Sequence, residues 1–209
     1  IWDVATGETV RVLRGHESWV ESAAYSPDGR FIITASGDKT ARIWDAASDS
    51  ESPTLSRHEF VVNSTAYSPD RRFLVTNSSD DSARIWDVAT GDEIRALRGH
   101  ELFVISAAYS PDGRFIVTAS QDGTARIWDA ATGETLWVLR GHRGGVYSAA
   151  YSPNGCFIVT GSSDDTVRIW DATTSLEIMV LRGHEDIVRS TAYSPDGRFI
   201  VTSSSDGTT

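Results

Sequence analysis

Short apolar and β-branched runs alternate with turn residues along the whole chain. In the first full unit, a run from Trp19 to Tyr25 ends at Ser26-Pro27-Asp28-Gly29, and the run Phe31–Ser36 follows. Proline fixes φ and glycine accepts positive φ, so Pro-Asp-Gly is strong turn chemistry. A third run, Thr40–Ala46, comes after a tight turn at Gly37-Asp38-Lys39. The pattern predicts three β-strands joined by turns.

A fourth run completes the unit and is clearest in three other copies: Glu8–Arg14, Glu93–Arg98 and Thr135–Arg140. Apolar residues with a 3.6-residue period occur in none of the runs, so no helix is predicted. The middle runs are apolar on both faces, as expected of strands that are covered on both sides.

The dipeptide Trp-Asp recurs at an unbroken interval of 42 residues, at Trp2, Trp44, Trp86, Trp128 and Trp170. A fixed period of this length indicates a repeat architecture. Four short strands in each period fit one blade of a propeller, and neighbouring blades then cover the apolar faces. The predicted fold is all-β: a β-propeller of four-stranded antiparallel blades with five blade-equivalents.

The chain resembles the WD-repeat β-propeller family over its whole length. The matching elements are Gly15-His16, Ser26-Pro27-Asp28-Gly29, Ser36-x-Asp38-x-Thr40 and Ile43-Trp44-Asp45, with equivalents in every copy. The second copy departs most, because Arg57 replaces the glycine before His58 and Pro53 interrupts the fourth strand. Proline is tolerated in a sheet only at an edge, which is where the family places this strand.

We expect residues 1–209 to form a single propeller domain. Its blades should span about 16–57, 58–99, 100–141, 142–183, and a composite of 184–209 with 1–15. In that arrangement the two termini lie close together. The family more often has seven blades, so an open arc cut from a larger ring stays possible. The start at Ile1, inside a repeat, suggests a fragment of a longer protein.

Composition narrows the range of partners. The chain has 19 Lys plus Arg against 29 Asp plus Glu, a formal charge of −10. Nucleic acids and anionic membranes attract basic surfaces, so neither is an expected partner. Cys156 is the only cysteine, which rules out an internal disulfide and a cysteine metal cluster. With no signal peptide evident, a cytoplasmic location is expected.

One histidine per copy, near Ser or Thr and Asp, raises the alternative of a hydrolase. The resemblance instead implies a buried hydrogen-bond network in each blade, and five identical catalytic triads would be unprecedented. Buried polar groups must be satisfied, which favours this structural role. The hydroxyl is expected from Thr34 or Ser36 and their equivalents. No catalytic, cofactor or metal residue is predicted. The network residues are His16, Asp38, Trp44, His58, Asp80, Trp86, His100, Asp122, Trp128, His142, Asp164, Trp170, His184, Asp206 and Trp2.

The copies differ at a few positions three to five residues after each histidine and just before each turn aspartate. The resemblance places these positions around the central channel, on the face used for partners. Aromatic residues and arginine are typical of interface hot spots. The alternative is neutral drift among recent duplicates. The candidate partner-binding residues are Trp19, Glu21, Val61, Asn63, Phe103, Ile105, Gln121, Tyr147, Ile187 and Arg189.

These observations predict a non-catalytic scaffold that binds a protein or peptide on the channel face. One alternative is a sensor array within a larger signalling protein, such as a nucleotide-dependent switch or kinase. An enzyme with a site at the channel mouth would need unrepeated reactive groups, and only Glu21, Asp186 and Arg189 are available. A purely structural spacer is a further alternative. Self-association is expected if the five-blade ring does not close.

Overall fold

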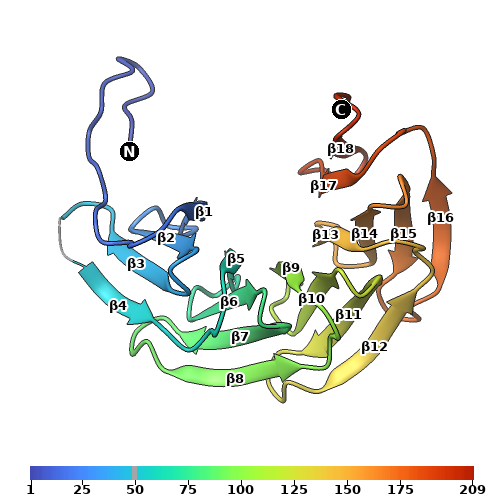
Figure 1. Ribbon diagram of the computed structural model, residues 1–209, viewed down its shortest axis with the longest axis horizontal. Helices are drawn as coiled ribbons and strands as arrows, with labels where there is room; N and C mark the ends of the chain where they lie inside the picture. The colour runs from blue at the N-terminus through green and yellow to red at the C-terminus, as the bar shows by residue number, and fades with distance from the viewer. Residues whose placement is uncertain (49–50) are drawn as a thin grey trace.

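The computed structural model describes residues 1–48 and 51–209, which form an arc of small antiparallel sheets (Figure 1). Four sheets have four strands each, and the last has two. This confirms the predicted all-β class and the four-stranded antiparallel blades. Within the described residues, no helix is long and apolar enough to cross a membrane.

The strands follow the 42-residue period. Blade 1 consists of β1 (Val20–Tyr25), β2 (Phe31–Ser36), β3 (Ala41–Asp45) and β4 (Glu51–Leu55). Blade 2 consists of β5 (Val62–Tyr67), β6 (Phe73–Ser78), β7 (Ser82–Asp87) and β8 (Glu93–Arg98). Blade 3 consists of β9 (Val104–Tyr109), β10 (Phe115–Ser120), β11 (Thr124–Asp129) and β12 (Thr135–Arg140). Blade 4 consists of β13 (Val146–Tyr151), β14 (Phe157–Ser162), β15 (Val167–Asp171) and β16 (Glu177–Leu181). The last sheet, blade 5, consists of β17 (Val188–Tyr193) and β18 (Ile200–Ser204).

Within each complete blade the strands pair in sequence order, from the inner strand to the outer one. The inner strands β1, β5, β9, β13 and β17 line the concave side of the arc, and β4, β8, β12 and β16 form its rim (Figure 1). Pro53 lies in β4, a sheet edge, so its missing N–H removes no ladder bond from a central strand. The edge placement predicted for this proline is confirmed.

Apolar contacts between blades form the core. Ile33 and Ile43 of blade 1 pack with Leu74 and Trp86 of blade 2, and the same arrangement recurs at the next interfaces. These side chains are at most 2 % exposed. Burying a side chain of this size contributes roughly 1.5–3 kcal/mol. Each blade therefore depends on a neighbour to cover its apolar faces.

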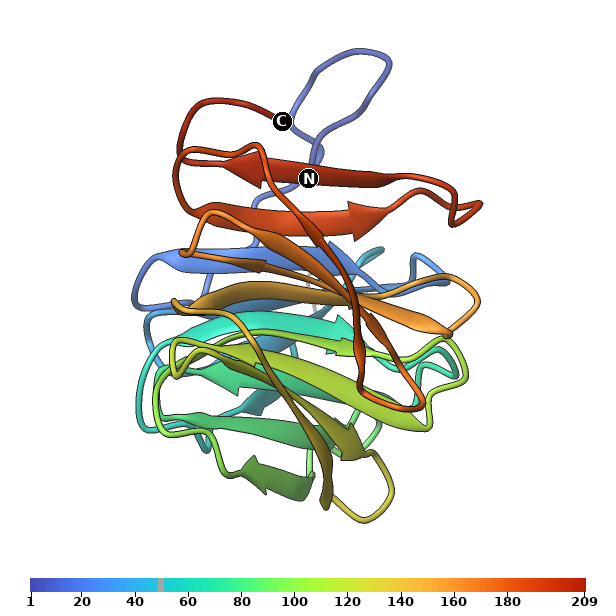
Figure 2. The same ribbon diagram turned by 90° about the vertical axis from the view of Figure 1, so that its right-hand side faces the viewer.

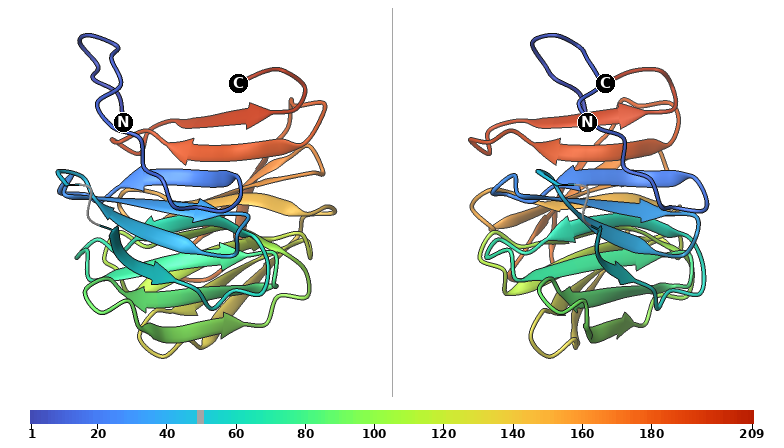
Figure 3. Two further views of the ribbon diagram at one scale, coloured as in Figure 1. Left: turned by 60° about the vertical axis from the view of Figure 1, so that its left-hand side comes forward. Right: turned by 90° about the vertical axis from the view of Figure 1, so that its left-hand side faces the viewer.

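The ring is open, and the expected composite blade is not formed in this structure. Figure 2 shows β17 and β18 as a two-stranded ribbon. Residues 1–15 loop away from blade 1 (Figure 3), where Trp2 forms an isolated bridge with Thr9. Arg11 holds this segment near blade 1 by donating to the carbonyl oxygen of Ala46 at 2.9 Å. The two termini lie on opposite sides of the gap (Figure 1).

The open ends expose apolar residues that are buried elsewhere in the arc. Val20 is 50 % exposed, whereas its equivalents are 0 % exposed: Val62, Val104, Val146 and Val188. Val201 at the other end is 55 % exposed, whereas its equivalents are 0 % exposed: Ile33, Val75, Val117 and Val159. The two ends thus carry the complementary halves of one blade interface.

We predict that the chain of residues 1–209 associates end to end in solution, because this buries both faces. Light scattering at increasing concentration should show a rising mass. Val20→Asp should shift the chain toward monomer, whereas Val4→Asp, at a fully exposed valine, should not. A monomer at every concentration would count against this association.

Candidate partner-binding face

In each complete blade, a chain of hydrogen bonds links the histidine before the inner strand to a threonine of the second strand and the tryptophan of the third. In blade 3, His100 Nδ1 lies 2.7 Å from Asp122 Oδ2, and Nε2 lies 2.7 Å from Thr118 Oγ1. Trp128 Nε1 donates to the same threonine oxygen at 2.8 Å. Because the ionised carboxylate can only accept, Nδ1 carries the proton and Nε2 accepts from the threonine hydroxyl. Every member of the chain thus has a partner.

The turn aspartate holds several segments together. Asp122 Oδ2 accepts from Glu101 N at 3.1 Å, and Oδ1 accepts from Thr124 N at 2.9 Å and from its hydroxyl at 2.6 Å. Burial alone would raise the pKa of Asp122. The hydrogen bonds from His100 and Thr124 outweigh it, so the pKa lies well below its usual value. The carboxylate stays ionised and ties the loop before β9 to the turn before β11.

The same arrangement occurs in all five copies. The distance from the histidine Nδ1 to the carboxylate is 2.7–3.1 Å, and the distance from Nε2 to the threonine oxygen is 2.6–2.8 Å. The hydroxyl comes from Thr34 and its equivalents, while Ser36 Oγ donates to the carbonyl oxygen of Trp19 at 2.9 Å. The sequence leaves both Thr34 and Ser36 as candidates for the histidine's partner. The structure shows that Thr34 contacts His16, while Ser36 does not.

The fifth network lacks its expected tryptophan. His184 reaches Asp206 at 2.9 Å and Thr202 at 2.8 Å. The sequence predicts that Trp2 completes this set, but Trp2 is 70 % exposed and pairs with Thr9 through an isolated bridge. The reason is the missing third strand of blade 5, which would have carried Trp2 alongside β18.

The variable position five residues after each histidine coincides with a β-bulge in the inner strand. The pairing of β1 with β2 skips one residue between Val20 and Ser22, and the other inner strands show the same shift. A bulged residue has no partner opposite it, so its side chain is re-aimed away from the regular pleat. The bulged residues are Glu21, Asn63, Ile105, Tyr147 and Arg189.

Two aromatic candidates are well exposed. Trp19 is 63 % exposed and Phe103 is 45 % exposed. The Trp19 indole N–H donates to Glu21, and its ring lies over Gly37, where an added Cβ would come within 2.7 Å of the ring. A larger residue at position 37 would clash with this indole. The residues at positions 19 and 37, which both differ among the copies, therefore depend on each other.

The remaining candidates are less accessible. Most are half-buried: Val61, Asn63, Ile105, Gln121, Tyr147 and Ile187. The side chain of Asn63 bonds to the next blade, since its Nδ2 donates to the carbonyl oxygen of Val104 at 2.8 Å. Arg189 is exposed, and its Nε donates to Ser205 Oγ at 2.6 Å. Trp19 and Phe103 therefore offer the largest free apolar surface among the candidates.

Two exposed apolar residues were missed from sequence. Phe60 is 55 % exposed and Leu102 is 49 % exposed, both two residues after a histidine. Lys39 lies with its Nζ 5.8 Å from the centre of the Phe60 ring. The signal was available, because this position also varies among copies: Ser18, Phe60, Leu102, Gly144 and Asp186. Leu102 directly precedes Phe103, so it extends the exposed apolar surface of that loop.

Replacing His100 by Ala should lower the free energy of unfolding by roughly 1–3 kcal/mol, the usual cost of leaving buried partners unsatisfied. The control is His184→Ala in the network without tryptophan, where the side chain is 15 % exposed rather than 1 %. Urea unfolding should show a smaller loss for His184→Ala. Equal losses would mean that the buried tryptophan adds nothing to the network.

The networks also predict acid sensitivity. The pKa of the turn aspartates is lowered in the folded chain, so their stabilisation is complete above the unfolded value of about 3.9 and is lost as pH falls toward the folded value. The urea midpoint should therefore drop between about pH 5 and pH 3. Asp122→Asn should be less stable at neutral pH and show a shallower drop; an unchanged slope would refute this assignment.

The family profile described as "WD domain, G-beta repeat" matches residues 7–45, 50–87, 91–129, 133–171 and 176–209. Single repeats also match known proteins. Over 43 residues the chain is 54 % identical to nuclear distribution protein PAC1 of Arthroderma otae, covering 21 % of this chain and 9 % of that protein. It is 46 % identical over 43 residues to the periodic tryptophan protein 2 homolog of Neurospora crassa, covering 21 % and 5 %.

It is 37 % identical over 43 residues to Lissencephaly-1 homolog 1 of Paramecium tetraurelia, covering 21 % of this chain and 11 % of that protein. The matched segments thus span about a tenth or less of these relatives. The family profile, by contrast, covers nearly the whole chain, with one match for each of the five repeats. The chain belongs to the WD-repeat family.

Proposed function

We propose that this chain is a non-catalytic scaffold that binds a protein or peptide on the face where the loops after the histidines meet the concave side. The exposure of Trp19 and Phe103 carries this proposal. Both occupy positions at which the copies differ, next to a His-Asp-Thr network that recurs in all five copies. Exposed aromatic residues held by a rigid scaffold are typical anchors for partners.

The family supports an interaction role. WD-repeat proteins bind other proteins, and the names of two relatives refer to nuclear distribution and to lissencephaly. Since only one repeat's length matches each of them, their partners are not transferred to this chain. The formal charge of −10 supports a protein partner over nucleic acid or an anionic membrane. A cytoplasmic location stays a prediction.

The chemistry of the face favours binding over catalysis. Thr118 is 0 % exposed, so the hydroxyl of the His-Asp-Thr set in blade 3 is closed to a substrate. The unrepeated charged groups have local partners: Asp186 accepts from the backbone N–H of Ile187, and Arg189 donates to Ser205. General acid–base chemistry needs a group free to exchange protons with a substrate. None of these groups is arranged as a reactive pair.

The test is a double substitution, Trp19→Ser with Phe103→Ser. Melting should change little, because surface substitutions usually fall within about 0.5 kcal/mol. Affinity for partners captured by the wild-type chain should fall by roughly 30-fold or more, since an aromatic anchor contributes about 2 kcal/mol.

The matched control is Trp137→Ser with Phe157→Ser, one tryptophan and one phenylalanine that are each 37 % exposed away from these loops. This control should retain every partner. If the control loses partners and the Trp19/Phe103 variant keeps them, the binding surface lies elsewhere.

A further inference from the structure

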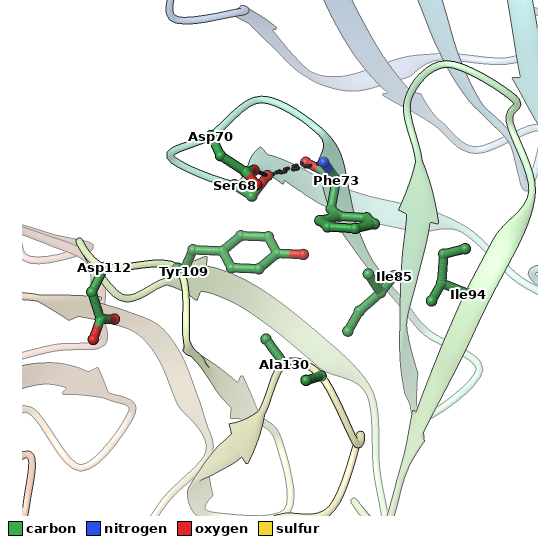
Figure 4. A pocket seen from close by; sticks show the side chains of 10 residues that line it. Ser68, Asp70, Phe73, Ile85, Ile94, Tyr109, Asp112 and Ala130 are labelled. Atoms are coloured by element: carbon green, nitrogen blue, oxygen red, sulfur yellow. Dashed lines mark hydrogen bonds between the residues drawn. The ribbon is translucent and has the colours of Figure 1, made fainter.

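We propose that the chain has a second binding site, a pocket between blades 2 and 3 that takes a large apolar side chain flanked by basic residues of a partner peptide. The pocket encloses about 290 Å³ and lies by the Pro-Asp turns, away from the loops that carry Trp19 and Phe103. Phe73 of blade 2 and Tyr109 of blade 3 form opposing walls, with Ile85, Ile94 and Ala130 at one end (Figure 4). This volume lies at the lower end of the range for ligand sites, which is enough for one large side chain.

The walls leave one polar group unsatisfied. The Tyr109 hydroxyl is buried and has no hydrogen-bond partner among the described residues, and burial raises the pKa of Tyr109. Figure 4 shows this hydroxyl directed toward the side of the pocket formed by Phe73 and Ile85. The equivalent tyrosines share the feature, so the hydroxyl alone does not distinguish this pocket. It does offer a donor to a backbone carbonyl of an inserted peptide.

Charge distinguishes this pocket from the equivalent groove between blades 1 and 2. That groove is lined by Arg71 and Arg72, and Arg71 Nη1 lies 3.3 Å from Asp28 Oδ2 across the two blades. Gly113 replaces Arg71 in the pocket between blades 2 and 3. The carboxylate of Asp70 therefore has no cross-blade arginine of that kind among the described residues.

Two carboxylates border the pocket. Hydrogen bonds from Ser68 and Ser110 lower the pKa of Asp70 and of Asp112, so both are ionised at neutral pH. The bonds from these hydroxyls use Oδ1, at 2.6 Å in each case. Within the described part of the chain, Oδ2 of each carboxylate makes no hydrogen bond.

Arg72 and Arg114 act electrostatically on Asp70 and Asp112, and both arginines have counterparts in other blades. Arg72 and Arg114 lie over the rings of Phe73 and Phe115, at 5.3 and 5.4 Å, and the same pair recurs at Arg30 and Arg198. They therefore do not set this pocket apart. The combination of an apolar hollow, an unpaired hydroxyl and two carboxylates whose Oδ2 atoms have no hydrogen-bond partner among the described residues fits an apolar residue between two basic ones.

The probe is the capped tripeptide Ac-Arg-Phe-Arg-NH2, titrated into the full ¹⁵N-labelled chain. Amide shifts should move at Ser68, Gly113 and Ala131, which line the pocket. Ac-Arg-Ala-Arg-NH2 tests the apolar side chain, and Ac-Glu-Phe-Glu-NH2 tests the charge. Each should bind at least about tenfold more weakly. Equal binding of all three peptides would overturn the proposal.

The chain supplies its own matched variants. Gly113→Arg recreates the residue of the neighbouring groove, and the backbone accepts it because Arg71 holds φ 66° where Gly113 has φ 73°. It should weaken the probe at least about tenfold by pairing with Asp70. Gly197→Arg is the control: its φ is 71° and its Cβ would meet Pro153 at 3.5 Å, as that of Gly113 meets Pro69 at 3.4 Å. This control should bind normally.

Asp112→Asn removes one charge while keeping the turn, since Asn154 already occupies the equivalent position and accepts from Ser152 at 2.7 Å. It should weaken the probe as well. The Trp19→Ser/Phe103→Ser variant should bind the probe normally, which separates this site from the proposed partner face. Loss of binding in that variant, or in Gly197→Arg, would overturn the assignment to this pocket.

Discussion

Each blade of this chain is apolar on both faces, and the arrangement of the whole molecule follows from that constraint. A four-stranded sheet of this kind is not stable alone in water, so it must be covered by the blade before and the blade after. The 0 % exposure of Ile33, Val75, Val117 and Val159 shows the constraint satisfied at four successive interfaces. The equivalent Val201 shows it unsatisfied, because β18 has no further blade beside it.

A second constraint is that buried polar groups need hydrogen-bond partners. Trp128, Thr118, His100 and Asp122 form one directional chain of donors and acceptors that ends on an ionised carboxylate. The Thr118 hydroxyl in this chain is 0 % exposed and already accepts from Trp128, so burial closes it to a substrate. The network also fixes the loop after the histidine. The position of Phe103 on the surface is thus set by a network buried beneath it.

Much of this could be predicted from the sequence, because the repeat supplies its own internal comparison. The strand order, the buried tryptophans and the exposed Trp19 follow from period, turn chemistry and family resemblance. The bulges at Glu21 and Asn63 could not be predicted, since a one-residue shift of register depends on pairing with the next strand. Asn63 lies at such a bulge. Its position varies among the copies, as surface positions do, yet its side-chain amide donates to the carbonyl oxygen of Val104 in the neighbouring blade.

Ring closure is the other point at which the structure differs from the prediction, since the last sheet keeps only two strands. The sequence contains the segments for a composite blade, but joining them requires ordering the 15 residues before His16 against β18. The observed segment instead pairs with itself through the Trp2–Thr9 bridge and is held beside blade 1 by the bond from Arg11 to Ala46. Because the blades are repeats, all blade interfaces are alike. The sequence therefore determines the contact surface at each end of the arc, but it does not determine which blade packs against that surface.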